Sequence, residues 1–263
     1  MAEMLWQPTP DRIADANLTH FAALVRERHG LNAEDYTALH RWSIEDRAAF
    51  WSMVWEYGAV IGDRGDGPEL VDGHRMRGAR WFPGASLNFA ENLLRRRDDA
   101  PAILFRGEDR VRYTLSFRQL HDAVSMVSRA LRAVGVGKGD RVAGYMPNMP
   151  ETVVAMLAAT GIGAIWSSAS PDFGVQGVVD RFGQIAPKVL FSADGYFYGG
   201  KRFDSIGRLG AVSARIPSIE RIVVVPYTTT APDVSAVEKA MTLDDFVTEH
   251  APAEIDFERL PFD

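Results

Sequence analysis

The stretch from Gly139 to Lys201 constrains the fold more than any other part of the chain. It switches three times between short apolar runs with strand character and longer amphipathic runs of helix length, and glycine or proline stands at each change. Such alternation is typical of a parallel βαβαβ unit. The sequence therefore predicts an α/β fold in which a mostly parallel sheet is flanked by helices.

The pattern also places the elements of this domain. Strands are expected at Arg141–Met146, Ala164–Ser168, Lys188–Ser192 and Arg221–Val225, and helices at Pro150–Gly161, Val175–Ala186 and around Ser205–Val212. A hairpin of Ala102–Phe105 and Val111–Leu115 precedes them. A long amphipathic helix follows that hairpin, and we expect Ser116 to cap it and Gly135 to end it.

Residues 1–95 have a different character, being rich in Trp and Arg at helical spacing without a convincing strand. We expect a helical N-terminal extension here and the main domain over residues 96–263. Asn17 is expected to cap a helix that Gly30 ends, and Ser43 with Asp46 resembles a capping box. The aromatic residues at this spacing are interpreted as core packing.

Composition excludes several classes of function. The 263 residues carry a net charge of −6 and contain no cysteine. We therefore expect no nucleic-acid partner, no disulfide and no thiolate chemistry, with the cytoplasm as the compartment. The longest apolar run, Val153–Trp166, is shorter than the roughly 18 residues that a membrane-spanning helix needs, so no membrane partner is expected.

The loops after the predicted strands are the places to look for a site. The carboxyl ends of parallel strands meet at one edge of a sheet, which brings together the loops Tyr145–Glu151, Ser167–Gly174 and Ser192–Lys201. Asn148 and Glu151 are either ligand-facing or helix-capping there. The loop from Ala193 to Lys201 is the sharpest candidate, because it leaves a strand, contains three glycines and ends in a cation.

Other chemical motifs are absent. The histidines lack His-Glu-x-x-His spacing, and no Gly-x-Ser-x-Gly occurs. Residues 135–139, Gly-Val-Gly-Lys-Gly, precede a strand, whereas phosphate-binding loops follow one. We therefore interpret them as a turn, and we expect neither a metal site nor a hydrolytic triad.

Two adjacent segments carry a family resemblance. They read GVGKGDRVAGYMPNMPE over 135–151 and VVAMLAATGIGAIWS over 153–167. The chain resembles the AMP-forming acyl-CoA synthetases, which are adenylate-forming ligases, from about Phe21 onward. Three further segments, 81–94, 170–174 and 178–190, are more similar to the ligases of acetoacetate than to those of acetate, which have two glycines where Pro171 and Asp172 stand.

The resemblance implies a two-step ligation. ATP, with Mg²⁺, activates acetoacetate or a similar short-chain acid as an acyl-adenylate, and the thiol of coenzyme A then displaces AMP. It also implies coenzyme A contacts. Ser170, Pro171 and Asp172 match a loop that lies against the adenine end of coenzyme A in the acetate enzymes. Lys201 matches a basic residue near its 3′-phosphate, and Tyr198 stands where those enzymes have an arginine.

The family's phosphate loop, adenine-binding segment and C-terminal lid do not occur in these residues. We therefore expect the first, incomplete part of the large domain of an adenylate-forming ligase, inactive alone, with a complementary chain as a candidate partner. The alternative is a non-catalytic module that binds coenzyme A or a partner. A dinucleotide-binding domain is poorly supported, since no Gly-x-Gly-x-x-Gly follows the first strand of the parallel unit.

Overall fold

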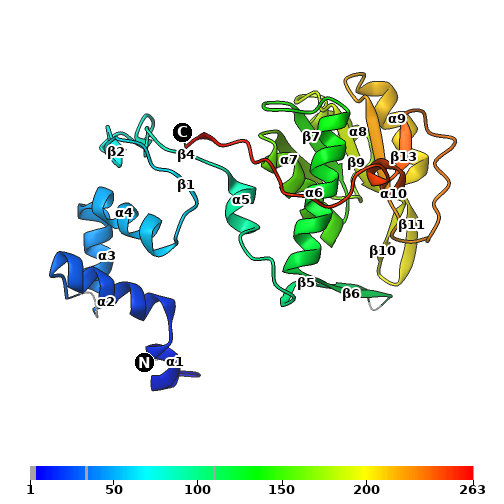
Figure 1. The fold of residues 1–263 in the computed structure, drawn as a ribbon. Coiled ribbons are helices and arrows are strands. Elements are labelled where there is room, and N and C mark those ends of the chain that lie inside the picture. The colour runs from blue at the N-terminus through cyan, green and yellow to red at the C-terminus, as the bar shows by residue number, and fades with distance from the viewer. Residues whose placement is uncertain (1–3, 33–34, 109, 263) are drawn as a thin grey trace. The chain divides into compact units, whose positions relative to one another are not determined.

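The computed structural model describes residues 4–32, 35–108 and 110–262 (Figure 1). The chain divides into two compact units. One takes in residues 1–86 and 261–263, and the other takes in residues 87–260. Each unit is described below by itself.

The N-terminal unit is built mainly of helices, as the sequence predicts. Its elements are α1 (Pro10–Ala14), α2 (Asn17–His29), α3 (Tyr36–Glu45), α4 (Arg47–Tyr57), β1 (Gly62–Asp63), β2 (Leu70–Val71) and β3 (Arg80–Trp81). The short strands were not expected, and β2 pairs with β3 antiparallel. Phe21, Val25, Leu39 and Met53 form a small core between α2, α3 and α4, which confirms that the aromatic and apolar stripe packs the helices together.

Two expected helix caps in this unit are wrong. Asn17 is the first residue of α2, and Ala16 takes the N-cap position without a side-chain bond. The helix α3 runs through Ser43, so no capping box forms there. Asp46 instead caps α4 alone, accepting a hydrogen bond from the Ala49 N–H at 3.1 Å. Gly30 does end α2, with a φ of 65° that favours glycine.

The second unit contains the predicted α/β domain. Its elements are α5 (Phe89–Leu93), β5 (Pro101–Gly107), β6 (Val111–Ser116), α6 (Phe117–Ala133), β7 (Arg141–Tyr145), α7 (Pro150–Gly161), β8 (Ile165–Ala169), α8 (Val175–Phe182), β9 (Val189–Ala193), β10 (Gly195–Tyr198), β11 (Lys201–Asp204), α9 (Ile206–Arg215), β12 (Arg221–Val225), β13 (Ala240–Thr242) and α10 (Leu243–Val247). The two-residue strands β4 (Ser86–Leu87) and β14 (Leu260–Pro261) stand where the chain passes between the units.

Five strands form one sheet in the order β13-β12-β9-β7-β8, and every neighbouring pair is parallel. The predicted mostly parallel sheet is therefore confirmed, with β13 as an addition that the sequence did not predict. The expected hairpin is also present, as the antiparallel pair β5 and β6.

Alternate residues of the strands enter two separate cores, one on each face of the sheet. On one face Val142, Phe191 and Val223 pack with residues of α6 and α7. On the other face Ala143, Leu190 and Val224 pack with residues of α8 and α9. A strand buried on both faces has a continuous apolar sequence, as Ile222–Val225 of β12 does.

An extended segment after α10 runs across α6, seen in red in Figure 1. Ser125 binds it in both directions, donating to the Ala253 carbonyl at 2.7 Å and accepting from the Ala253 N–H at 2.9 Å. Arg129 donates to the Ala251 carbonyl and Arg132 to the Asp256 carbonyl. Side chains of α6 therefore supply hydrogen-bond partners for this backbone, which pairs with no strand in the described part of the chain.

Candidate functional site

The direction of the chain reverses at the strand β7. From β7 the chain passes through α7 to β8 on one side, and it then returns through α8 to β9 on the other side of β7. The two connecting helices lie on opposite faces of the sheet, since α7 belongs to one core and α8 to the other. In open α/β sheets, ligands bind beyond the carboxyl ends of the strands at such a reversal.

A cavity of about 380 Å³ lies at this place. The residues that line it come from the loops and the hairpin that follow β7, β8, β9 and β12: Pro147, Asn148, Ser170, Pro171, Asp172, Tyr196, Phe197, Tyr198 and Tyr227. Four of the five residues singled out from sequence, Ser170, Pro171, Asp172 and Tyr198, are therefore brought together around one space. Lys201 is not among the lining residues.

Where a loop was expected from Ala193 to Lys201, the chain forms a hairpin of β10 and β11 that spans Gly195 to Asp204. The strands β10 and β11 pair antiparallel, and Gly199 and Gly200 make the turn with φ angles of 58° and 76°. Positive φ at both central residues gives the twist that suits a two-residue hairpin. Two of the three glycines, Gly199 and Gly200, therefore shape a turn.

The pairing sets the positions of the two remaining candidate residues. Tyr198 lies directly opposite Lys201 in the register, so their side chains share one face of the hairpin. Tyr198 is 72% exposed. An aromatic and a cationic residue thus stand side by side on the hairpin, and Tyr198 also lines the cavity, which suits a ligand that combines a flat ring with an anionic group.

The loop from Ser170 to Gly174 is held from beneath by two side chains. The buried Tyr145 hydroxyl lies 2.9 Å from the Pro171 carbonyl oxygen and within hydrogen-bond distance of the Phe173 carbonyl. Arg208 donates to both the Tyr145 hydroxyl and the Pro171 carbonyl at 3.3 Å. A polar Tyr145 at the end of an apolar strand is the one local sign of this support; nothing local points to Arg208.

Substituting Tyr145 tests this support. We expect Tyr145→Phe to lower the free energy of unfolding by about 1 kcal/mol, since it removes a buried hydroxyl from a loop that Arg208 still contacts. Urea unfolding would measure the change, and amide hydrogen exchange would follow the loop itself. Equal exchange in the loop of Tyr145→Phe and of the unsubstituted chain would contradict the assignment.

Asp194, directly after β9, anchors the other side of the site. Its carboxylate, 1% exposed, accepts hydrogen bonds from the backbone N–H groups of Tyr227, Thr228 and Thr229, each at 2.8 Å. The hydroxyls of Thr228 and Thr229 add two more at 2.7 and 3.0 Å. Burial alone raises the pKa of Asp194, but the hydrogen bonds from Thr228, Tyr227 and Thr229 outweigh it and hold the pKa below its ordinary value. Asp194 therefore stays ionised and fixes the segment that places Tyr227 against the cavity.

Asn148 and Glu151 differ in role. Asn148 lines the cavity. Glu151 accepts the Tyr113 hydroxyl, with distances of 2.7 and 2.8 Å to its two oxygens. Neither residue caps α7, because Met149 is its N-cap and makes no side-chain bond. The sequence left open whether these two residues face a ligand or cap the helix, and the capping role is wrong for both.

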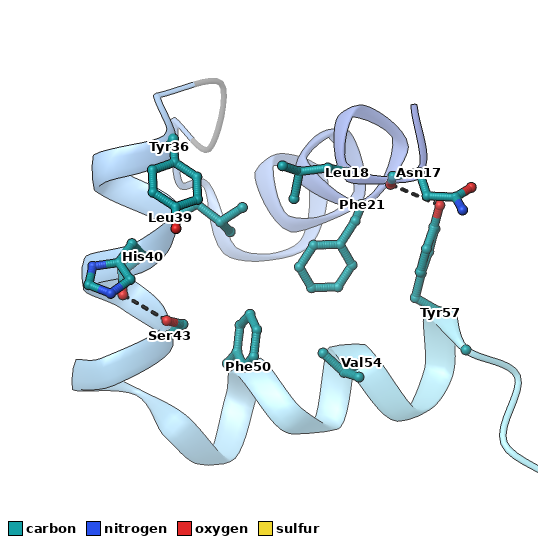
Figure 2. A pocket seen from close by; sticks show the side chains of 11 residues that line it. Asn17, Leu18, Phe21, Tyr36, Leu39, His40, Ser43, Phe50, Val54 and Tyr57 are labelled. Atoms are coloured by element: carbon teal, nitrogen blue, oxygen red, sulfur yellow. Dashed lines mark hydrogen bonds between the residues drawn. The ribbon is translucent and has the colours of Figure 1, made fainter. Parts of the chain in front are cut away.

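A larger cavity, of about 430 Å³, lies within the N-terminal unit between α2, α3 and α4. Figure 2 shows Phe21, Phe50 and Val54 facing one another across it, with Leu18 and Leu39 beside them. Its polar groups largely satisfy each other: the Tyr57 hydroxyl donates to the Asn17 carbonyl, and the Ser43 hydroxyl to the His40 carbonyl. An almost wholly apolar wall offers little chemistry, so we take the cavity at the end of the sheet as the candidate site.

Within residues 4–32, 35–108 and 110–262, no three His, Asp or Glu side chains are gathered closely enough to hold a metal ion. In the same part of the chain, no helix has the length and apolar character of a membrane span.

Comparison with known proteins identifies the family. The AMP-binding enzyme family matches residues 89–254, and a second family, the acetyl-coenzyme A synthetase N-terminus, matches residues 36–93. The chain belongs to the AMP-binding enzyme family. Its parallel sheet and N-terminal helices match the corresponding part of the adenylate-forming ligase fold.

Individual relatives agree with this assignment. The acetoacetyl-coenzyme A synthetase of Rhizobium meliloti (strain 1021) is 49% identical over 98% of this chain and 39% of its own length. That of Macaca fascicularis is 39% identical over 99% of this chain and 40% of its own length. The solved structure of acetoacetyl-CoA synthetase from Streptomyces lividans is 40% identical, with a TM-score of 0.90 over 100% of this chain and 40% of that one. The chain thus spans about two fifths of the length of the relatives that it matches.

Proposed function

We propose that this chain forms the coenzyme A side of an AMP-forming acetoacetate–CoA ligase. The observation that carries the proposal is the cavity at the chain reversal, which is lined by the loops after β7 and β8 and by the β10–β11 hairpin. The acyl substrate is inferred from the relatives, which are named acetoacetyl-CoA synthetases. We place the enzyme in the cytoplasm, in keeping with a sequence that contains no cysteine.

The residues of the site fit one end of a coenzyme A molecule. Tyr198, Phe197 and Tyr227 offer aromatic faces to a flat ring or to the thin pantetheine arm. Asn148 and Ser170 add polar groups, and Lys201 supplies a cation for a phosphate beside the cavity. Asp172 repels a phosphate, which favours placing the anionic end of the ligand on the side of Lys201.

The complete reaction joins acetoacetate to coenzyme A and cleaves ATP to AMP and pyrophosphate. The carboxylate of acetoacetate would attack the α-phosphorus of ATP, with Mg²⁺, forming the acyl-adenylate and releasing pyrophosphate. The thiol of coenzyme A would then displace AMP to give acetoacetyl-CoA. For these residues we propose binding and orientation of coenzyme A, which lower the entropic cost of the second step. We assign the activation step to no residue described above.

A titration calorimetry experiment tests the proposal. We expect coenzyme A to bind the 263-residue chain, and Lys201→Glu to weaken that binding about tenfold, because an attractive charge near a phosphate becomes a repulsive one. The effect should shrink at high salt. The proposal would be rejected if coenzyme A gave no heat of binding with either protein.

Arg221→Glu provides the matched control. Arg221 is exposed at the amino end of β12, the edge of the sheet away from the cavity, and it donates to the carbonyl of its neighbour Glu220. The change in charge is the same as in Lys201→Glu. An equal loss of affinity in both variants would show a general effect of net charge and would count against a site beside Lys201.

A further inference from the structure

The β5–β6 hairpin reaches across to the turn of the β10–β11 hairpin. Glu108, at the end of β5, accepts the Gly199 N–H with one carboxylate oxygen at 3.0 Å and the Gly200 N–H with the other at 2.9 Å. Arg110 donates to the Gly200 carbonyl at 3.2 Å. Both N–H groups and one carbonyl of this exposed turn are therefore satisfied by side chains from a second hairpin.

Behind this polar contact the two hairpins are also linked by aromatic packing. The Arg110 guanidinium lies 5.4 Å from the centre of the Phe197 ring, and Phe197 packs edge-on against Tyr227 at 5.5 Å. Gly107 comes so close to Tyr227 that a Cβ at that position would lie 2.2 Å from the Tyr227 hydroxyl oxygen. Phe197 and Tyr227 both line the cavity, so the contact extends from the turn to the wall of the site.

The turn between β5 and β6 sets the backbone conformation of Glu108. Its φ is 45°, in the left-handed region that tight hairpin turns use. The turn is closed by the Arg110 N–H, which donates to the Gly107 carbonyl at 2.9 Å. The hairpin itself therefore holds Glu108 at its tip, where the carboxylate meets the two N–H groups of the Gly199–Gly200 turn.

We infer that Glu108 and Arg110 act as a clamp that positions the β10–β11 hairpin, and with it the Tyr198 and Lys201 side chains, for coenzyme A. They are positioning residues, since Glu108 contacts the turn, and Arg110 contacts the turn and Phe197. This role rests on the proposed coenzyme A site. The clamp itself is a property of the chain that is measured separately.

Selective labelling makes the clamp visible by nuclear magnetic resonance. The sequence holds one Gly-Gly pair, Gly199–Gly200, and two Tyr-Gly pairs, Tyr57–Gly58 and Tyr198–Gly199. Carbonyl-¹³C glycine or tyrosine combined with ¹⁵N-glycine therefore isolates the amide signals of Gly200, Gly199 and Gly58. An N–H that donates to a carboxylate resonates downfield. In Glu108→Ala we expect the Gly199 and Gly200 signals to move upfield, while Gly58 serves as an internal reference. Unmoved signals would overturn the clamp.

Calorimetry with coenzyme A tests the positioning role. We expect Glu108→Ala to weaken binding about fivefold, the size of one net hydrogen bond in an exposed site, with Glu108→Gln between it and the unsubstituted chain. Glu249→Gln, at an exposed carboxylate beyond α10, should bind as the unsubstituted chain does. Normal binding by Glu108→Ala would overturn the positioning role alone. No binding by the unsubstituted chain would overturn the proposed function and this role with it.

Discussion

Replacing Asp194 with alanine is expected to lower the free energy of unfolding by about 4 kcal/mol. The substitution removes the acceptor of five hydrogen bonds and leaves the N–H groups of Tyr227, Thr228 and Thr229 without it. Unpaired buried donors each cost a desolvation penalty, which makes this loss larger than that of a single bond. Urea unfolding at neutral pH would measure it. Asp244→Ala, at an exposed aspartate in the first turn of α10, should change stability by only a few tenths of a kcal/mol.

The same carboxylate gives a pH dependence whose sign is fixed. The pKa of Asp194 is lower in the folded chain than its ordinary value of 3.8. The folded state therefore binds fewer protons than the unfolded state around that pH, and the stabilisation is fully present above it. As the pH falls below 3.8 and through the folded-state pKa, the stabilisation is lost. The difference in stability between the unsubstituted chain and Asp194→Ala should shrink over that range; a difference that is constant down to pH 2 would contradict an ionised Asp194.

Local sequence signals were enough for the regular elements of the sheet. The strand Arg221–Val225 and the helix Pro150–Gly161 begin and end as predicted, since a continuous apolar run and a proline at the first helical position mark them. The other predicted strands of the parallel sheet differ from expectation by one residue at one or both ends, and β5 of the hairpin extends two residues beyond the expected Phe105. Helix α8 ends at Phe182 rather than at Ala186, whose φ is 48°.

The hairpin at Gly199–Gly200 could have been predicted. Three consecutive aromatic residues, Tyr196-Phe197-Tyr198, precede the two glycines and favour a strand, and a Gly-Gly pair is a recognised signal for a two-residue hairpin turn. The three glycines were instead interpreted as backbone that a ligand could approach closely. The interpretation of Lys201 changes accordingly, from the end of a loop to the first residue of a strand opposite Tyr198.

The supports of the site could not be predicted, because their partners are distant in sequence. Asp194 binds residues 33 to 35 positions away, and Glu108 binds residues 91 and 92 positions away. The sequence around a carboxylate does not indicate which distant backbone N–H groups will donate hydrogen bonds to it. The parallel pairing of β9 with β12 brings Asp194 beside residues 227–229, and the contact of Glu108 joins two hairpins that lie outside that sheet. The coenzyme A contacts of Ser170, Pro171, Asp172, Tyr198 and Lys201 stay predictions that the titrations above address.

Replacing Asn88 with alanine is expected to cost about 3 kcal/mol. Asn88, 2% exposed, caps α5 by accepting the Glu91 N–H at 3.1 Å. Its amide nitrogen lies 3.0, 3.1 and 2.7 Å from the carbonyl oxygens of Thr160, Gly161 and Glu258. One side chain thus joins the start of α5, the end of α7 and the extended segment after α10. Alanine removes the cap and both amide donors from a site that water does not reach.

Two further substitutions separate these contributions. Asn88→Ser keeps an oxygen that can cap α5 and should recover about 1 kcal/mol of the loss. Asn88→Asp also keeps a cap acceptor, but it brings a carboxylate against three carbonyl oxygens and should be less stable than Asn88→Ala. The Glu258 N–H, which donates to the Gly161 carbonyl at 2.9 Å, reports on the junction itself through its hydrogen exchange. Slow exchange of Glu258 in Asn88→Ala, together with a loss below 1 kcal/mol, would show that the extended segment holds its place without Asn88.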